Sequence, residues 1–84
     1  MPGTDVTVRL FAAARVAAGT AELHVAPGPI DEVIAALAEG RDGRFSQVLS
    51  ISTLISDGVR LDRHARTPVP AGAVIDVLPP FAGG

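Results

Sequence analysis

The chain has 84 residues, 48% of them hydrophobic, which suits one domain near the lower limit for a core that folds without disulfide or metal staples. It contains no cysteine, which excludes disulfides, thiolate metal sites, iron–sulfur clusters and cysteine nucleophiles. The formal net charge is −2 and the seven cationic side chains, all arginine, are scattered, which excludes the basic stripe that nucleic-acid binding needs.

The N-terminal part of the chain predicts a strand, a short helix and a second strand. Apolar and polar residues alternate over residues 6–11, the pattern of a strand with one buried face. The alanine-rich segment 12–18 predicts a short helix that ends at Gly19, and residues 21–25 predict a peripheral strand. Arg15 interrupts the apolar run, so no export signal is predicted, and no segment approaches the ~20 apolar residues that span a bilayer. We therefore expect a cytoplasmic protein without membrane contacts.

The middle of the chain predicts the main helix. Pro27-Gly28-Pro29 is expected to be a break, after which apolar residues recur at helical spacing from Ile30 to Leu37. Asp31 and Glu32 stand near the start of this helix, where its dipole favours acidic side chains. The helix is expected to end near Gly40.

The remaining elements are shorter and end in a strand that two prolines terminate. In chain order the patterns predict one or two helical turns over 45–49, a strand over 51–55, a tight turn at Asp57-Gly58, a return strand over 59–61, a loop over 63–70 and a last strand over 74–78. Pro79 and Pro80 have no N–H to donate, so strand pairing is expected to stop there.

This order of elements predicts an α+β protein with a β-grasp, or ubiquitin-like, fold. A mixed sheet of four to five strands is expected, with the first strand beside the last and one main helix packed across one face. We expect a single domain over residues 1–78, followed by a flexible C-terminal tail over residues 79–84.

The last residues are Pro79-Pro80-Phe81-Ala82-Gly83-Gly84. Two glycines without Cβ atoms can thread a tunnel too narrow for side chains, and they carry an accessible carboxylate. The prolines stiffen the root of the tail and lower the entropy lost on insertion. An ordinary frayed terminus is the alternative interpretation.

The opening segment 6–19, with Leu10-Phe11-Ala12-Ala13-Ala14-Arg15, and the closing segment 74–84 resemble the MoaD/ThiS family of ubiquitin-like sulfur carriers over essentially the whole chain. Within the family the Pro-Pro form of the tail is most similar to the small subunit of molybdopterin synthase. The family commonly has an asparagine before the hairpin glycine, whereas Ile55-Ser56 precede the turn here, which leaves the local register open.

The resemblance implies that Gly84 is the reactive residue. An E1-like, MoeB-like enzyme would use ATP to adenylate its carboxylate, and sulfur would replace AMP to give a thiocarboxylate. Gly83, Ala82 and Phe81 would thread into a MoaE-like large subunit, in a heterotetramer, where the sulfur passes to a cyclic pterin precursor. No cofactor is expected to stay bound, and no catalytic residue is expected in this chain besides Gly84.

The same alternation predicts a docking surface near the tail. Phe11, Val74 and Leu78 should face away from the helix and form an exposed apolar patch, which Pro79, Pro80 and Phe81 would extend. An aromatic side chain beside a threaded tail is a plausible hot spot. Phe11 or Phe81 could instead fold over the domain's own sheet edge.

The remaining polar residues carry weaker signals. Arg9, Arg60, Arg63 and Arg66 could meet acidic partners, although a solvated face explains most of them. His24 and His64 lack neighbours at ligand spacing, so no metal site is predicted.

Three other functions remain open. They are a carrier for thiazole or cysteine synthesis, a ubiquitin-like binding module without tail chemistry, and conjugation of Gly84 to lysines of other proteins.

Overall fold

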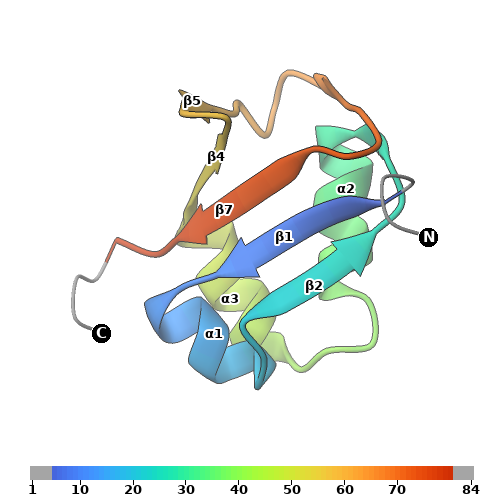
Figure 1. The fold of residues 1–84 in the computed structure, drawn as a ribbon. Coiled ribbons are helices and arrows are strands. Elements are labelled where there is room, and N and C mark those ends of the chain that lie inside the picture. The colour runs from blue at the N-terminus through green and yellow to red at the C-terminus, as the bar shows by residue number, and fades with distance from the viewer. Residues whose placement is uncertain (1–4, 81–84) are drawn as a thin grey trace.

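The computed structural model describes residues 5–80. Five strands form one mixed sheet in the order β2-β1-β7-β4-β5 (Figure 1). The strands are β1 (Val6–Leu10), β2 (Glu22–Val25), β4 (Thr53–Ser56), β5 (Val59–Arg60) and β7 (Val74–Leu78). β1 and β7 are parallel, and the other neighbours are antiparallel. The β-grasp prediction is therefore confirmed, including the first strand beside the last.

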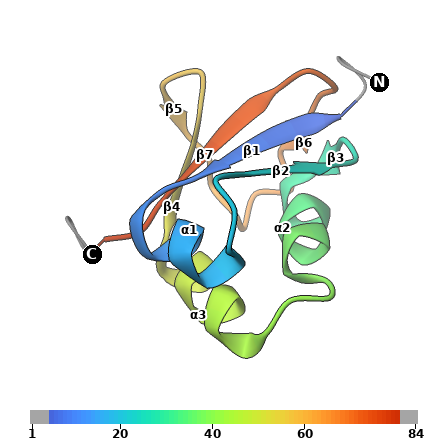
Figure 2. The same cartoon turned by 60° about the horizontal axis from the view of Figure 1, so that its bottom comes forward.

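Three helices lie on one side of this sheet, as Figure 2 shows: α1 (Ala12–Ala18), α2 (Ile30–Ala38) and α3 (Gly43–Ile51). Alternate residues of the central strands face them, because successive side chains of a strand point to opposite faces. The buried apolar side chains between helices and sheet are Val6, Val8, Leu10, Ala14, Ile30, Val33, Leu37, Phe45, Leu49, Leu54, Val69, Ile75 and Val77.

The helix ends follow from local chemistry. Gly19 ends α1 in the left-handed region with φ 74°, and its N–H donates to the carbonyls of Arg15 and Val16. At the start of α3 the Asp42 carboxylate accepts a hydrogen bond from the Phe45 N–H at 3.1 Å. This cap makes α3 longer than the one or two turns expected from its apolar spacing.

The boundary between α3 and β4 also differs from the expectation. Ile51 is the last residue of α3, not the first of a strand, and β4 begins at Thr53. Ser52 is buried between them, and its Oγ donates to the Val48 carbonyl at 2.7 Å. The serine thus hydrogen-bonds to the last turn of the helix. A strand prediction based on β-branched residues alone does not reveal this bond.

Two further segments are more ordered than predicted. Gly28–Pro29 (β3) pairs with Pro68–Val69 (β6) in a short antiparallel ladder, so the proline-rich break and part of the expected loop form a second small sheet. The Asp57-Gly58 turn is confirmed: both residues have positive φ, 52° and 77°, as a two-residue hairpin turn requires.

Candidate functional site

The candidate site is the end of β7, where the chain leaves the sheet. β7 lies in the middle of the sheet, and Ile75 and Val77 fix it to the core with exposures of 1% and 0%. Leu78 and Pro79 are half-buried, and Pro80 is exposed. The root of the tail is therefore held by a central buried strand and is carried to the surface within two residues.

Phe11 lies beside this exit. The parallel register pairs Leu10 with Val77, so the next residues, Phe11 and Leu78, are neighbours at the same end of the two strands. Thr53 of β4 pairs with Leu78 from the other side. Phe11 is 38% exposed, and the Arg9 guanidinium lies 5.9 Å from the centre of its ring.

The backbone next to Phe11 is strained. Ala12 begins α1 with φ 49°, in the left-handed region that non-glycine residues rarely adopt. Such residues persist only where the surrounding structure imposes them, and they concentrate at functional sites. The turn at Ala12 lets α1 start directly after β1 and leaves Phe11 at the sheet end.

An ion pair occupies the middle of the helix-free face. Arg9 Nε lies 2.6 Å from Asp76 Oδ1, and Nη2 lies 2.9 Å from Oδ2, a two-point contact between adjacent strands. The hydrogen bond and charge of Asp76 raise the pKa of Arg9 above its usual value. Both residues occupy outward positions of strands predicted to be neighbours, so this contact could have been found from the sequence.

The ion pair separates two residues of the predicted patch. Val74 stands at the opposite end of β7 from Leu78, with Asp76 between them on the same face. Their separation along the strand is about 13 Å, from the usual rise of ~3.3 Å per residue. The two residues therefore do not touch directly, contrary to the single compact patch that alternation suggested.

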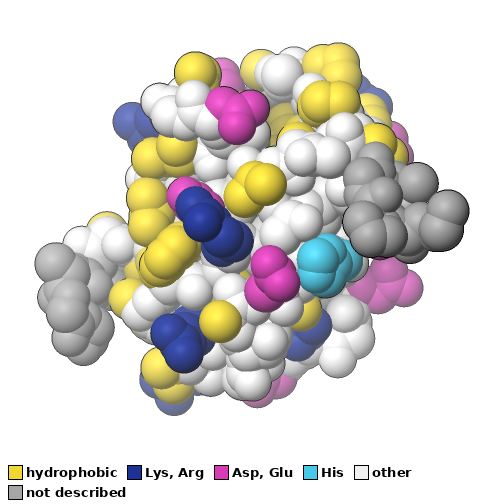
Figure 3. Space-filling model, viewed as in Figure 1, with side chains coloured by type: hydrophobic (Ala, Val, Ile, Leu, Met, Phe, Trp, Pro, Cys, Tyr) yellow, Lys and Arg dark blue, Asp and Glu magenta, His cyan; other side chains and the backbone are white. Residues whose placement is uncertain are grey.

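Ile55, which was not among the residues predicted for the patch, connects the two ends of β7. It pairs with Asp76 from β4 and is half-buried, so Val74 and Leu78 are both its diagonal neighbours across the strands. Phe11, Ile55, Val74 and Leu78 will be called the sheet-face patch. Figure 3 shows hydrophobic side chains gathered on this face at the side where β7 ends, next to the charged groups at its centre.

The reactive part of the predicted site lies outside the described residues. This holds for Phe81, Ala82, Gly83 and Gly84, so the threading and chemistry assigned to them stay predictions. The structure describes their point of attachment, the chain up to Pro80, and the sheet-face patch around it.

The other candidate residues have ordinary local partners. Arg66 lies 3.0 Å from Asp31 and 3.6 Å from Glu32, and His24 lies 3.5 Å from Glu22. All of these residues are exposed except Asp31, which is half-buried. Within residues 5–80 no group of three or more histidine or acidic side chains could hold a metal ion. In the same range no helix is long and apolar enough to cross a membrane.

Comparison with known proteins identifies the fold. No protein-family model matches the chain, and no curated protein matches it in sequence. Solved structures do match over nearly the whole chain, among them SAMP1 from Haloferax volcanii, with 19% identity, a TM-score of 0.78 and coverage of 95% of this chain and 99% of that one.

Two further structures show the same likeness. The first, small archaeal modifier protein 1 from Methanosarcina acetivorans, has 24% identity and a TM-score of 0.73, with 96% and 97% of the two chains covered. The second is a chain from the complex of subunits 1 and 2 of the molybdopterin-converting factor of Helicobacter pylori. It has 25% identity and a TM-score of 0.70, with 95% and 99% covered. The chain therefore has the ubiquitin-like β-grasp fold of the MoaD/ThiS-like proteins, as the sequence resemblance predicted.

Proposed function

We propose that this chain is a ubiquitin-like sulfur carrier that acts through the carboxylate of Gly84, and more narrowly the small subunit of a molybdopterin synthase. The observation that carries the proposal is the attachment of the Phe81-Ala82-Gly83-Gly84 tail to a central buried strand beside the sheet-face patch, in which Phe11 is exposed and the other members are half-buried. The molybdopterin-converting factor of H. pylori, whose structure is a complex of two subunits, supports a protein partner.

The chemistry begins with a carboxylate, which is a poor electrophile because it is anionic and lacks a leaving group. An activating enzyme would transfer AMP from ATP to the Gly84 carboxylate and release pyrophosphate. A sulfur nucleophile, such as an enzyme persulfide, would then attack the carbonyl carbon and expel AMP, which leaves an acyl disulfide. A two-electron reductant, such as a thiol, would cleave its S–S bond and release the Gly84 thiocarboxylate and the enzyme thiol. Covalent activation of this kind divides one difficult step into two easier ones.

The domain's own role would be to aim the tail. Six residues from Pro79 to Gly84 can span at most about 20 Å when extended, at ~3.3 Å per residue. That reach suits a reactive centre buried in a partner, which would supply the cations or backbone N–H groups that stabilise the developing charge. The sheet-face patch would dock on the partner, with Phe11 and Leu78 nearest the tail.

A second candidate is attachment of Gly84 to amino groups of other proteins. It is favoured by the likeness to two structures of small archaeal modifier proteins. In this case the same adenylate would be attacked by a lysine amine, giving an amide in place of a thiocarboxylate. All seven cationic side chains of this chain are arginine, so it could not be its own lysine acceptor.

Intact-mass measurement separates these functions. The protein is incubated with the activating enzyme of the same organism, ATP and a persulfide donor, and the variant lacking Gly84 serves as the control. Exchange of one oxygen for sulfur in the full chain supports the carrier, and an unchanged mass contradicts it. Sulfur transfer from the loaded protein to the pterin precursor with a large synthase subunit tests the narrower proposal, whereas higher-mass conjugates in cells would favour the modifier.

A further inference from the structure

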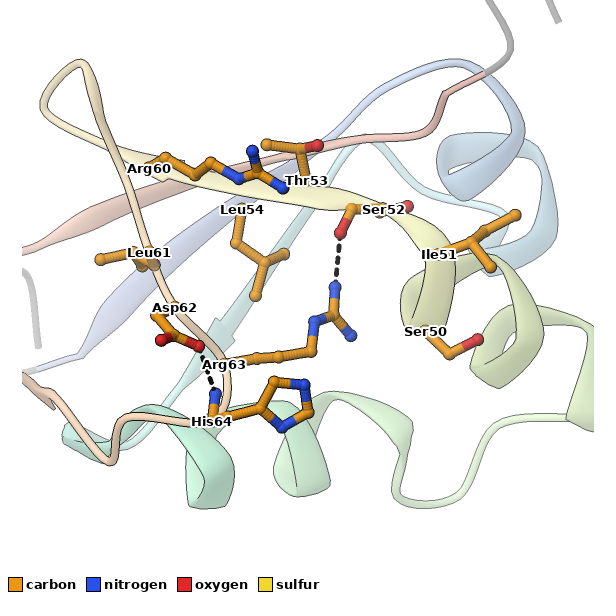
Figure 4. Close-up of a pocket in the computed structure, with 10 residues that line it drawn as sticks. All are labelled: Ser50, Ile51, Ser52, Thr53, Leu54, Arg60, Leu61, Asp62, Arg63 and His64. Carbon is orange, nitrogen blue, oxygen red and sulfur yellow. Dashed lines mark hydrogen bonds between the residues drawn. The ribbon is translucent and has the colours of Figure 1, made fainter.

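A second surface feature lies on the β4–β5 side of the sheet. It is a hollow of about 480 Å³ between the end of α3 with β4 and the segment that follows β5 (Figure 4). Its lining is Ser50, Ile51, Ser52, Thr53, Leu54, Arg60, Leu61, Asp62, Arg63 and His64. The docking surface described above does not include it.

Two arginines, Arg60 and Arg63, line this hollow, and neither is ion-paired with a carboxylate of the described residues. Within residues 5–80, no carboxylate lies within ion-pair distance of Arg60, whereas Arg9 and Arg66 are paired with acidic side chains. Arg63 is held in place because its Nη2 donates to the carbonyl oxygens of Leu49, at 3.1 Å, and Ser52. Arg63 therefore caps the negative end of α3 and keeps its remaining N–H groups available.

The other polar groups of the lining define the charge of a suitable ligand. The Ser50 and Ser52 hydroxyls already donate to carbonyls of α3, each at 2.7 Å, so the arginines are the main donors. Asp62 also lines the hollow, and its Oδ1 accepts a hydrogen bond from the backbone N–H of His64 at 2.8 Å. The two guanidinium groups and the one carboxylate of the lining together carry one net positive charge. This balance matches a singly charged carboxylate better than a phosphate dianion.

The hollow is close to the root of the tail. Thr53 lines it and also pairs with Leu78, the last residue before Pro79. A protein that receives the tail would therefore cover the rim of the hollow. Because a guanidinium matches the two oxygens of a carboxylate, the geometry points to a site for the side chain of a glutamate or aspartate on that protein. The identity of the partner rests on the proposed function, whereas carboxylate binding by the hollow does not.

NMR titration of the isolated full-length protein tests carboxylate binding directly. The side-chain Nε–H signals of the arginines are followed while acetyl-Gly-Glu-Gly-amide is added at constant ionic strength. We expect saturable shifts at Arg60 and Arg63, little change at Arg15 and Arg44, and about fivefold weaker binding in Arg60→Gln, the range of an exposed charge-assisted contact. Arg60 is exposed and has no partner to lose, so this variant should fold normally, and Arg44→Gln is the matched control.

Three outcomes would overturn the inference. They are equal, unsaturable shifts at all arginines, equal shifts with the acetyl-Gly-Gln-Gly-amide peptide, and binding of inorganic phosphate about tenfold tighter than the glutamate peptide, which would make the hollow a phosphate site. None of them affects sulfur loading of Gly84, so failure here is distinguishable from failure of the proposed function. If the activating enzyme or large subunit binds the protein, Arg60→Glu should weaken that complex and Arg44→Glu should not.

Discussion

Replacing Phe11 by alanine separates docking from folding. Phe11 exposes 38% of its surface, so about 62% is covered in the isolated domain. For a phenylalanine of roughly 200 Å², the exposed share is about 80 Å², worth about 2 kcal/mol at ~25 cal/mol per Å² if a partner covers it. The covered share is about 120 Å², worth about 3 kcal/mol as an upper bound and about 2 kcal/mol after allowing for a compact unfolded chain.

Phe11→Ala should therefore weaken a complex with the tail-receiving partner about thirtyfold, beyond its effect on the isolated domain. The measurements are calorimetric titration against the purified large subunit or activating enzyme and thermal unfolding of the isolated protein. Val16→Ala is the matched control, because Val16 is 73% exposed on α1 and lies off the sheet face. Unchanged affinity in Phe11→Ala, or an equal loss in Val16→Ala, would refute the reasoning.

Three further predictions concern the tail and the backbone. Deletion of Gly84 should abolish sulfur loading, measured by intact mass, and leave the melting temperature nearly unchanged; a large loss of stability would contradict a free tail. Gly58→Ala should lower the free energy of unfolding by about 1 kcal/mol, because a residue with a Cβ is strained at the φ of 77° that Gly58 adopts. No atom lies within 4 Å of the added Cβ, so a steric clash would not contribute. Gly43→Ala, which is equally uncrowded and has no positive φ, should show no such loss in denaturant unfolding. Asp42→Ala should cost about 1 kcal/mol in the same assay because the Phe45 N–H loses its cap, and Asp42→Asn should retain most of that stability.

The sequence predicted the parts of the fold that strict alternation specifies. Residues 6–10 alternate between apolar and polar side chains, and in residues 74–78 the single charged residue, Asp76, marks the outward positions. Both strands appear with alternate residues buried, Ile75 and Val77 among them. Gly19 marked the end of α1 correctly, because a left-handed residue there is best supplied by glycine. Long apolar periodicity likewise located α2.

The prediction was less accurate where side chains bond to nearby backbone. The side-chain hydrogen bonds of Asp42 and Ser52 lengthen α3 and place the start of β4 later than predicted. Hydrophobic spacing does not reveal such bonds. Ile55 was consequently not assigned to the outer face. The arginine-lined hollow also escaped prediction, since it depends on how the segment after β5 packs against the end of α3, which no local pattern specifies.

β7 lies between β1 and β4, so without it the sheet would be two separate ribbons, β2 with β1 and β4 with β5. Isolated two-stranded ribbons are at best marginally stable in water. The parallel pairing joins Arg9 and Asp76, 67 positions apart, and such distant pairing is slow to form. The sheet-face patch is thus complete only when β7, the strand that bears the tail, has inserted between β1 and β4. An enzyme that must bind this patch before it modifies Gly84 would act on folded molecules and not on nascent or misfolded copies.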